Sequence, residues 1–130
     1  MTTSLLLIFN HTFTDSQKSD ALVSLGTRRI VDMPEDIKEV WRRIPADLPK
    51  IFHHLEPVKN WLVSNAVKDD YVLIQGDFGA CYIMVNFAFE KGFIPVYSTT
   101  ERMVHEEDEN DGAINVTHRF CHRIYRRYER

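Results

Sequence analysis

A histidine between two polar residues is the clearest candidate for acid–base chemistry. His11 stands between Asn10 and Thr12, directly after the apolar run Leu5–Phe9. An imidazole can take up or release a proton near neutral pH, and it can also donate a hydrogen bond to a phosphate. The sequence therefore makes His11 a candidate general acid or base, with Asn10 and Thr12 as candidate ligand contacts.

A glycine-containing loop offers a candidate anion site. The segment Gln75-Gly76-Asp77-Phe78-Gly79 follows a predicted strand over 71–74 and leads into a predicted helix. Glycines leave the backbone N–H groups unblocked, and the positive end of a helix dipole attracts an anion such as phosphate. The same segment also fits a structural role, in which Asp77 caps the helix and the glycines make the turn. Both interpretations stay open on the sequence.

A third polar segment follows the fourth predicted strand, 93–97. It consists of Ser98, Thr99 and Thr100, with Arg102 just beyond it as the basic residue best placed to bind phosphate. In an open parallel sheet, ligands bind outside the carboxyl ends of the strands. We therefore expect the three polar segments to meet at one edge of the sheet.

Missing motifs exclude several familiar chemistries. The chain has no G-x-G-x-x-G, no G-x-x-x-x-G-K-[ST] and no G-x-S-x-G, which argues against a dinucleotide cofactor, a P-loop nucleotide hydrolase and a serine hydrolase. His118 and His122 are four positions apart, but no third ligand stands at a metal-binding spacing. No metal and no organic cofactor are therefore expected. Cys81 is expected in the core, at a helix N-terminus that would lower its pKa, and Cys121 in a packed hairpin.

Strands that can position these groups follow from the apolar runs. Short runs without polar alternation are typical of strands buried on both faces of a parallel sheet. They occur at 5–9, 71–74 and 93–97, and residues 29–33 are predicted as a further short strand.

Helices are predicted between these strands. The S/T-x-x-Q pattern of Thr14-Asp15-Ser16-Gln17 is a capping box that opens a helix ending at Gly26. Pro34 starts an amphipathic helix, and a helical stripe from 48 to 66 should be kinked or split at Pro57. The helix 80–91, which Gly92 ends as a left-handed cap, is apolar almost all round, so we expect it to be covered on most sides and to lie partly against a partner subunit.

The C-terminal part differs in composition. Residues 101–112 contain six acids and one base, and Asn110-Asp111-Gly112 is typical of a hairpin turn. The strip after the turn is basic and aromatic, which fits either a phosphate- and base-binding surface or a charged edge strand. Its residues are Arg119, Phe120, Arg123, Tyr125, Arg126, Arg127, Tyr128 and Arg130. The prediction is a single α/β domain over 1–130, with a Rossmann-like, mostly parallel sheet and flanking helices over 1–100 and a C-terminal β-hairpin extension over 101–130.

Length, charge and composition restrict the class of protein. The 130 residues are 44% hydrophobic and carry a formal charge of −3, which is ordinary for one globular domain. No apolar run approaches the ~18 residues of a membrane span, and the start lacks a signal peptide. Two cysteines without a C-x-x-C pattern favour a reducing, cytoplasmic location. The modest charge argues against a general binder of duplex DNA or RNA.

Three segments together resemble a known family. Asn10–Thr14, Tyr71–Ala80 and Ile94–Thr100 are similar, in order and spacing, to segments of small CRISPR-associated proteins related to the CRISPR-associated Rossmann fold (CARF) domains and regarded as ring nucleases. The resemblance covers nearly the whole chain. At the position beside His11 where a serine is expected in this family, the chain has Asn10.

The resemblance implies a function in type III CRISPR signalling. It implies a homodimer that binds a cyclic oligoadenylate, most readily cyclic tetra-adenylate, and cleaves it without a metal into linear products ending in a 2′,3′-cyclic phosphate, so switching off the antiviral response. The alternatives are a CARF-type sensor or sponge that only binds the ring, and a scaffold that assembles through its hairpin. Candidate catalytic residues are His11, Asp77 and Arg102, and candidate ligand contacts are Asn10, Thr12, Gln75, Gly76, Phe78, Gly79, Thr99 and Thr100.

Overall fold

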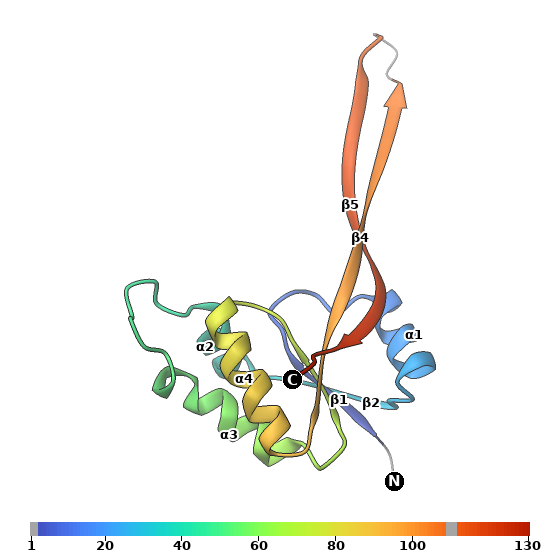
Figure 1. The fold of residues 1–130 in the computed structure, drawn as a ribbon. Coiled ribbons are helices and arrows are strands. Elements are labelled where there is room, and N and C mark those ends of the chain that lie inside the picture. Colours follow the sequence, from blue (N-terminus) through green and yellow to red (C-terminus); the bar gives the residue numbers. More distant parts are fainter. Residues whose placement is uncertain (1–2, 109–111) are drawn as a thin grey trace.

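Five strands form one mixed sheet in the order β2-β1-β3-β4-β5. A computed structural model describes residues 3–108 and 112–130 (Figure 1). Strands β1 to β4 are parallel, and β5 pairs antiparallel with β4. Their bounds are β1 Ser4–Ile8, β2 Arg29–Asp32, β3 Tyr71–Ile74, β4 Ile94–Asp108 and β5 Ile114–Arg127. The predicted α/β class with a mostly parallel sheet and a C-terminal hairpin is confirmed.

The helices lie on both faces of the sheet. Helix α1 (Asp15–Ser24) covers one face, and α2 (Glu35–Arg42), α3 (Glu56–Asn65) and α4 (Phe78–Glu90) cover the other (Figure 1). A short 3₁₀ helix, η1 (His53–Leu55), leads into α3. Within the described residues, no helix combines the length and the apolar character needed to cross a lipid bilayer.

Strand β1 is central to both cores, which explains why its sequence is apolar without alternation. Leu6 and Ile8 pack in the core beneath α2, α3 and α4, and Leu5 and Leu7 pack with Ala21 of α1 on the opposite face. All four leucine and isoleucine side chains are buried. A strand with helices on both faces has no polar face to show in its sequence.

The predicted capping signals at the start of α1 and at the end of α4 are confirmed. The Thr14 hydroxyl accepts from the Gln17 backbone N–H, and the Gln17 side chain accepts from the Thr14 backbone N–H, completing the capping box of α1. Gly92 follows α4 with a φ of +78°, the left-handed conformation expected of its cap.

The helix expected over 48–66 is wrong in its first half. Residues 43–52 form turns and irregular backbone that pass Pro45 and Pro49, and the helical structure begins only at η1. Pro57 lies in the first turn of α3, where its missing N–H costs no hydrogen bond, so it neither kinks nor splits the helix.

The expectation that the fourth strand ends at Tyr97 is also wrong. Strand β4 runs on to Asp108, because β5 supplies hydrogen-bond partners along almost its whole length, with a register shift between Ser98 and Thr100. The boundary expected at residue 100 therefore passes through a continuous strand. The outer part of the hairpin, 101–108 with 114–121, extends away from the rest of the molecule, and we call it the arm (Figure 1). The turn residues Asn110 and Asp111 lie outside the described residues.

Candidate functional site

The chain changes direction across the sheet at the carboxyl ends of β1 and β3. From β1 it passes through α1 on one face to β2, and from β3 it passes through α4 on the other face to β4. Loops that leave two adjacent parallel strands for opposite faces open a crevice between them, which is the usual ligand site of such sheets. Here Asn10 and His11 follow β1, and Gln75 and Gly76 follow β3. The Gln75 backbone N–H donates to the Ile8 carbonyl, so the two loop starts are side by side.

A large cavity lies on the α4 side of this edge. It has a volume of about 950 Å³ and extends from Gln75 and Gly76 along α4 to the C-terminal residues. Its walls are rich in aromatic rings, and Phe78 is 95% exposed at its entrance. The rings belong to Phe78, Tyr82, Phe89, Tyr97 and Tyr128. Exposed rings on α4 also show that this helix is not covered on all sides within one chain.

A smaller cavity of about 460 Å³ lies beside the β1 loop. It is lined by Asn10, His11 and Thr12 together with basic residues of α1 and α2. Lys38 forms an ion pair of 2.6 Å with Asp32, and Arg42 of the same cavity is paired with acids of its own helix. The charge of this cavity is therefore largely balanced.

The predicted site residues divide among three places. Asn10, His11 and Thr12 line the smaller cavity, and Gln75, Gly76 and Phe78 line the larger one. The expected loop at Ser98, Thr99 and Thr100 does not exist, because these residues lie inside β4. Thr99 bonds through its hydroxyl to the backbone N–H and C=O of Ile124, and Arg102 lies on the arm opposite Phe120. Thr99, Thr100 and Arg102 line neither cavity.

Packing explains Gly76. A Cβ at this position would lie 2.8 Å from Nε1 of Trp41 and 3.0 Å from two of its ring carbons. The indole is buried, and its Nε1 donates to the Gln75 carbonyl at 2.9 Å, so it cannot move aside without losing that bond. Gly79 differs, because a Cβ there would make only ordinary contacts at 3.5 Å and beyond. Gly76 is required by the tryptophan beneath it.

Asp77 performs the structural role that the sequence left open. Its carboxylate accepts from the Ala80 backbone N–H at 3.0 Å and caps the start of α4. Phe78, Gly79 and Asp77 itself are exposed around this helix terminus. The loop therefore presents backbone N–H groups and an aromatic ring to solvent, while its carboxylate is engaged with the helix.

The expectation that a helix N-terminus lowers the pKa of Cys81 is wrong. Burial raises the pKa of this thiol to about 11, and the negative charge of Asp77 adds to the increase. A hydrogen bond with the Gly76 backbone acts in the opposite direction but is outweighed. Cys81 is therefore a protonated packing residue at neutral pH, although it touches the larger cavity.

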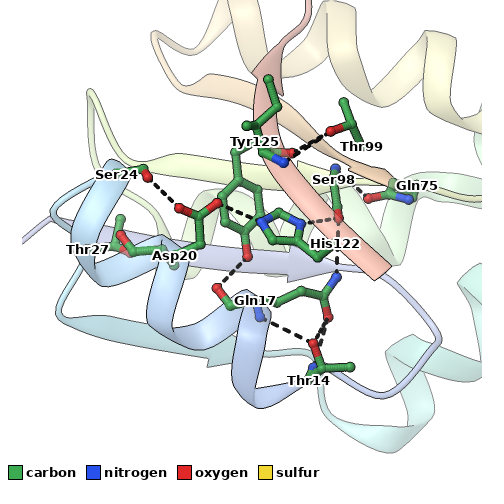
Figure 2. Close-up of polar contacts among 12 residues, drawn as sticks. Thr14, Gln17, Asp20, Ser24, Thr27, Gln75, Ser98, Thr99, His122 and Tyr125 are labelled. Atoms are coloured by element: carbon green, nitrogen blue, oxygen red, sulfur yellow. Dashed lines mark hydrogen bonds and ion pairs between the residues drawn. The ribbon is translucent and has the colours of Figure 1, made fainter. Parts of the chain in front are cut away.

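A partly buried line of three polar residues was missed by sequence reasoning. His122 of β5 lies between Ser98 of β4 and Asp20 of α1, as Figure 2 shows. The Ser98 Oγ to His122 Nδ1 distance is 2.5 Å, and the His122 Nε2 to Asp20 Oδ2 distance is 2.6 Å. The same three residue types form hydrolytic triads, but Ser98 is only 6% exposed and lines neither cavity. Its hydroxyl therefore faces neither of the two cavities.

Hydrogen bonds around this line tie α1 to the hairpin. Gln17 donates from its side chain toward Ser98 Oγ at 3.5 Å, and the Tyr125 hydroxyl donates to the Gln17 carbonyl at 2.8 Å (Figure 2). Burial raises the pKa of Asp20, but hydrogen bonds with Ser24 and His122 and the charge of His122 together outweigh it and lower the pKa. The cluster fixes α1 against β4 and β5.

The basic strip of the C-terminal strand is largely engaged within the chain. Three of its arginines pack over aromatic rings, with guanidinium-to-centroid distances of 5.5 Å for Arg126 over Tyr97, 5.7 Å for Arg127 over Tyr71 and 4.8 Å for Arg130 over Phe89. Arg123 forms an exposed ion pair of 3.3 Å with Glu101. These contacts favour the charged-edge interpretation of the strip, while Arg130 remains at the wall of the larger cavity.

Comparison with known proteins places the chain in a family. The model of the uncharacterized protein MJ1673 family matches residues 3–126. The chain belongs to this family. Uncharacterized protein MJ1673 of Methanocaldococcus jannaschii is 43% identical to it over 124 residues, which cover 95% of each chain. No solved structure matches the chain.

The residues matched by the MJ1673-family model include the candidate site except for the C-terminal residues that line the larger cavity. Residues 3–126 contain both strand-end loops, the Ser98–His122–Asp20 line and β5 as far as Arg126. Tyr128 and Arg130, which close the larger cavity, lie beyond the matched range.

Proposed function

We propose that this chain is a ring nuclease that binds a cyclic oligoadenylate, with cyclic tetra-adenylate as the first ligand to test, and cleaves it without a metal. The proposal joins the resemblance to small CARF-related proteins with a Rossmann-like interpretation of the sheet. The observation that carries it is the arrangement at the β1 and β3 ends, where an exposed helix terminus stands beside a cavity lined by aromatic rings.

Binding of the ring uses backbone and aromatic groups. The N–H groups of Phe78 and Gly79, at the positive end of α4, suit a phosphate of the ring. Phe78 and Tyr82 are exposed on α4 and offer faces on which adenines stack, each stack contributing roughly 1–3 kcal/mol. A small cyclic anion does not need a strongly positive electrostatic field around the whole protein, so a formal charge of −3 is compatible with this ligand.

The proposed cleavage uses only groups that the chain contains. The ribose 2′-oxygen attacks its own 3′-phosphorus, the bond from phosphorus to the next 5′-oxygen breaks, and the 2′-hydroxyl proton leaves to a base while a proton reaches the departing 5′-oxygen. The products are a linear strand with a 2′,3′-cyclic phosphate and a 5′-hydroxyl. His11 serves as acid or base, and the N–H groups of Phe78 and Gly79, with Arg130 at the cavity wall, stabilise the charge on phosphorus oxygens. Arg102 lies on the arm, outside both cavities, and Asp77 acts through the helix cap.

A twofold dimer would complete the site. His11 and Phe78 line different cavities in one chain, and a ring of four equivalent nucleotides can meet the same pair of loops from two subunits. Exposed Phe78 and Tyr82 on α4 provide apolar surface for such an approach. The ligand would then lie across the subunit interface.

The test is conversion of cyclic tetra-adenylate in the presence of EDTA, followed by chromatography. We expect linear products with the natural chain, strongly reduced conversion with His11→Ala, and unchanged conversion with the control His53→Ala, which alters an exposed histidine of η1. Tight binding without linear product would instead support the sensor or sponge. No affinity for the ring would refute both and leave the scaffold.

A further inference from the structure

The side chain of Gln75 lies where the next hydrogen bond between β3 and β4 is expected. The Ile94 N–H donates to the Asp70 carbonyl, so by the alternation of a strand the Ser98 N–H also points toward β3. Strand β3 has ended at Ile74, however, and the Ser98 N–H donates instead to Oε1 of Gln75 at 2.8 Å (Figure 2). The side chain therefore continues the ladder past the end of the strand.

Three hydrogen bonds hold Gln75 in one position. Its backbone N–H donates to the Ile8 carbonyl at 3.2 Å, its carbonyl accepts from the Trp41 indole at 2.9 Å, and its side-chain oxygen accepts from Ser98. The residue is thus bonded to β1, α2 and β4. A side chain with so many fixed partners presents its remaining polar group in one orientation.

The remaining group of Gln75 is a hydrogen-bond donor. A backbone N–H can only donate, so the atom that faces Ser98 is the amide oxygen, and Nε2 points away from it (Figure 2). Among the described residues nothing accepts from Nε2, and the atom stays accessible, since the buried side-chain atom without a partner there is Nε2 of His54. Gln75 lines the larger cavity. Its amide therefore offers that cavity two N–H hydrogens and no acceptor.

Donors gather at this end of the larger cavity. Phe78 and Gly79 are exposed in the first turn of α4, where backbone N–H groups have no partner within the helix. The other end, where α4 finishes, is lined by two carboxylates and one guanidinium, from Glu90, Glu129 and Arg130. A phosphodiester is negatively charged and only accepts hydrogen bonds, so it is more favourable beside the donors than at the far end.

We propose that Gln75 binds a phosphodiester of the cyclic oligoadenylate through Nε2, next to the N–H groups at the start of α4. The inference rests on the proposed function and adds to it a side-chain contact that fixes one phosphate in the larger cavity. The contact is made by a neutral amide, so its strength does not change with pH across the neutral range.

Two amides of the same cavity give a matched test. Gln75→Glu keeps an oxygen for the Ser98 N–H but replaces the free donor with a carboxylate oxygen. Asn86 also lines the cavity, and its Nδ2 donates to the Tyr82 carbonyl at 3.0 Å, so Asn86→Asp adds the same charge at an amide that is already engaged. Binding is measured by calorimetry with cyclic tetra-deoxyadenylate, which lacks the attacking 2′-hydroxyl and stays intact.

The two variants should differ in affinity. We expect Gln75→Glu to raise the Kd on the order of thirtyfold, and Asn86→Asp to raise it by less than about threefold. An unchanged Kd for Gln75→Glu overturns this inference and leaves the proposed function in place. Equal losses in the two variants would reflect charge alone and also overturn it. Absence of binding by the natural chain refutes the proposed function and the inference with it.

A second measurement needs no variant. Gln17 and Gln75 are the two glutamines of the chain, so labelling of the glutamine side-chain nitrogen gives two amide groups in a magnetic resonance spectrum. The Gln17 amide donates to Ser98 Oγ and lines neither cavity. We expect the deoxyadenylate ring to shift the Gln75 signals alone, and adenosine, which has no phosphate, to shift neither. An equal Gln75 shift with adenosine would indicate a base contact and overturn the assignment to phosphate.

Discussion

Replacement of Gly76 by alanine tests whether the loop after β3 is set by Trp41. The added Cβ would lie 2.8 Å from the indole Nε1, well inside normal contact, and the buried ring is held by its hydrogen bond to the Gln75 carbonyl. Relief requires either a shift of the ring or a shift of the loop. Overpacking of this kind costs about 1–3 kcal/mol, and loss of the indole bond adds about 1 kcal/mol. We expect Gly76→Ala to lower the free energy of unfolding by about 2–4 kcal/mol.

The matched control is Gly79→Ala, three residues further on, in the first turn of α4. A Cβ at Gly79 meets nothing closer than 3.5 Å, and alanine is the better helix former, so this variant should be neutral or slightly stabilising. Urea unfolding of both variants, followed by tryptophan fluorescence and by circular dichroism, gives the two free energies. Equal stability of Gly76→Ala and Gly79→Ala would refute the role of Trp41 in this loop.

Three further predictions concern the side chains of Tyr125, Asp20 and Cys81. Tyr125→Phe removes the hydroxyl that donates to Gln17 and should lower the free energy of unfolding in urea by about 1 kcal/mol; an unchanged midpoint would contradict the bond. The pKa of Asp20 is lowered from its ordinary 3.8, so its ionised form stabilises the fold above that pH, and this contribution is lost as the pH falls through the folded-state pKa. Asp20→Asn should therefore reduce the loss of unfolding free energy at acid pH in a series of urea titrations. An unaltered dependence of the unfolding free energy on pH would contradict this. With a pKa of about 11, Cys81 should react with iodoacetamide at pH 8 about a hundredfold more slowly in the folded than in the unfolded chain. The rates are measured in a Cys121→Ser background, so that only Cys81 reacts. Equal rates in the two states would exclude the raised pKa.

Features encoded by neighbouring residues could be predicted from the sequence. The capping box at Thr14, the strand 71–74 and the left-handed Gly92 each depend on a few consecutive residues, and all three are found. The strand-end positions of His11 and Gln75 follow from the same local patterns, so the edge of the sheet that bears the candidate site was predictable.

Features set by distant residues could not be predicted. Strand β4 continues past Tyr97 because β5, more than a dozen residues later, pairs with it. Gly76 is required by Trp41, and the partner of His122 is Asp20, 102 positions away. The spacing of His118 and His122 drew attention to a possible metal, yet no signal in one sequence points to a carboxylate at the other end of the chain. Such contacts appear only when the topology brings the elements together.

Strand β4 runs without a break from the core of the sheet into the arm, so a movement of the arm is coupled to the core through this strand. The register shift between Ser98 and Thr100 is the place where this strand bends relative to β5. There the Ser98 backbone N–H donates to the side chain of Gln75 at 2.8 Å, and Gln75 begins the loop that lines the larger cavity. A displacement of the arm is therefore transmitted to the wall of the larger cavity by β4 itself, which contributes Tyr97 to that wall, and by the hydrogen bond between Ser98 and Gln75.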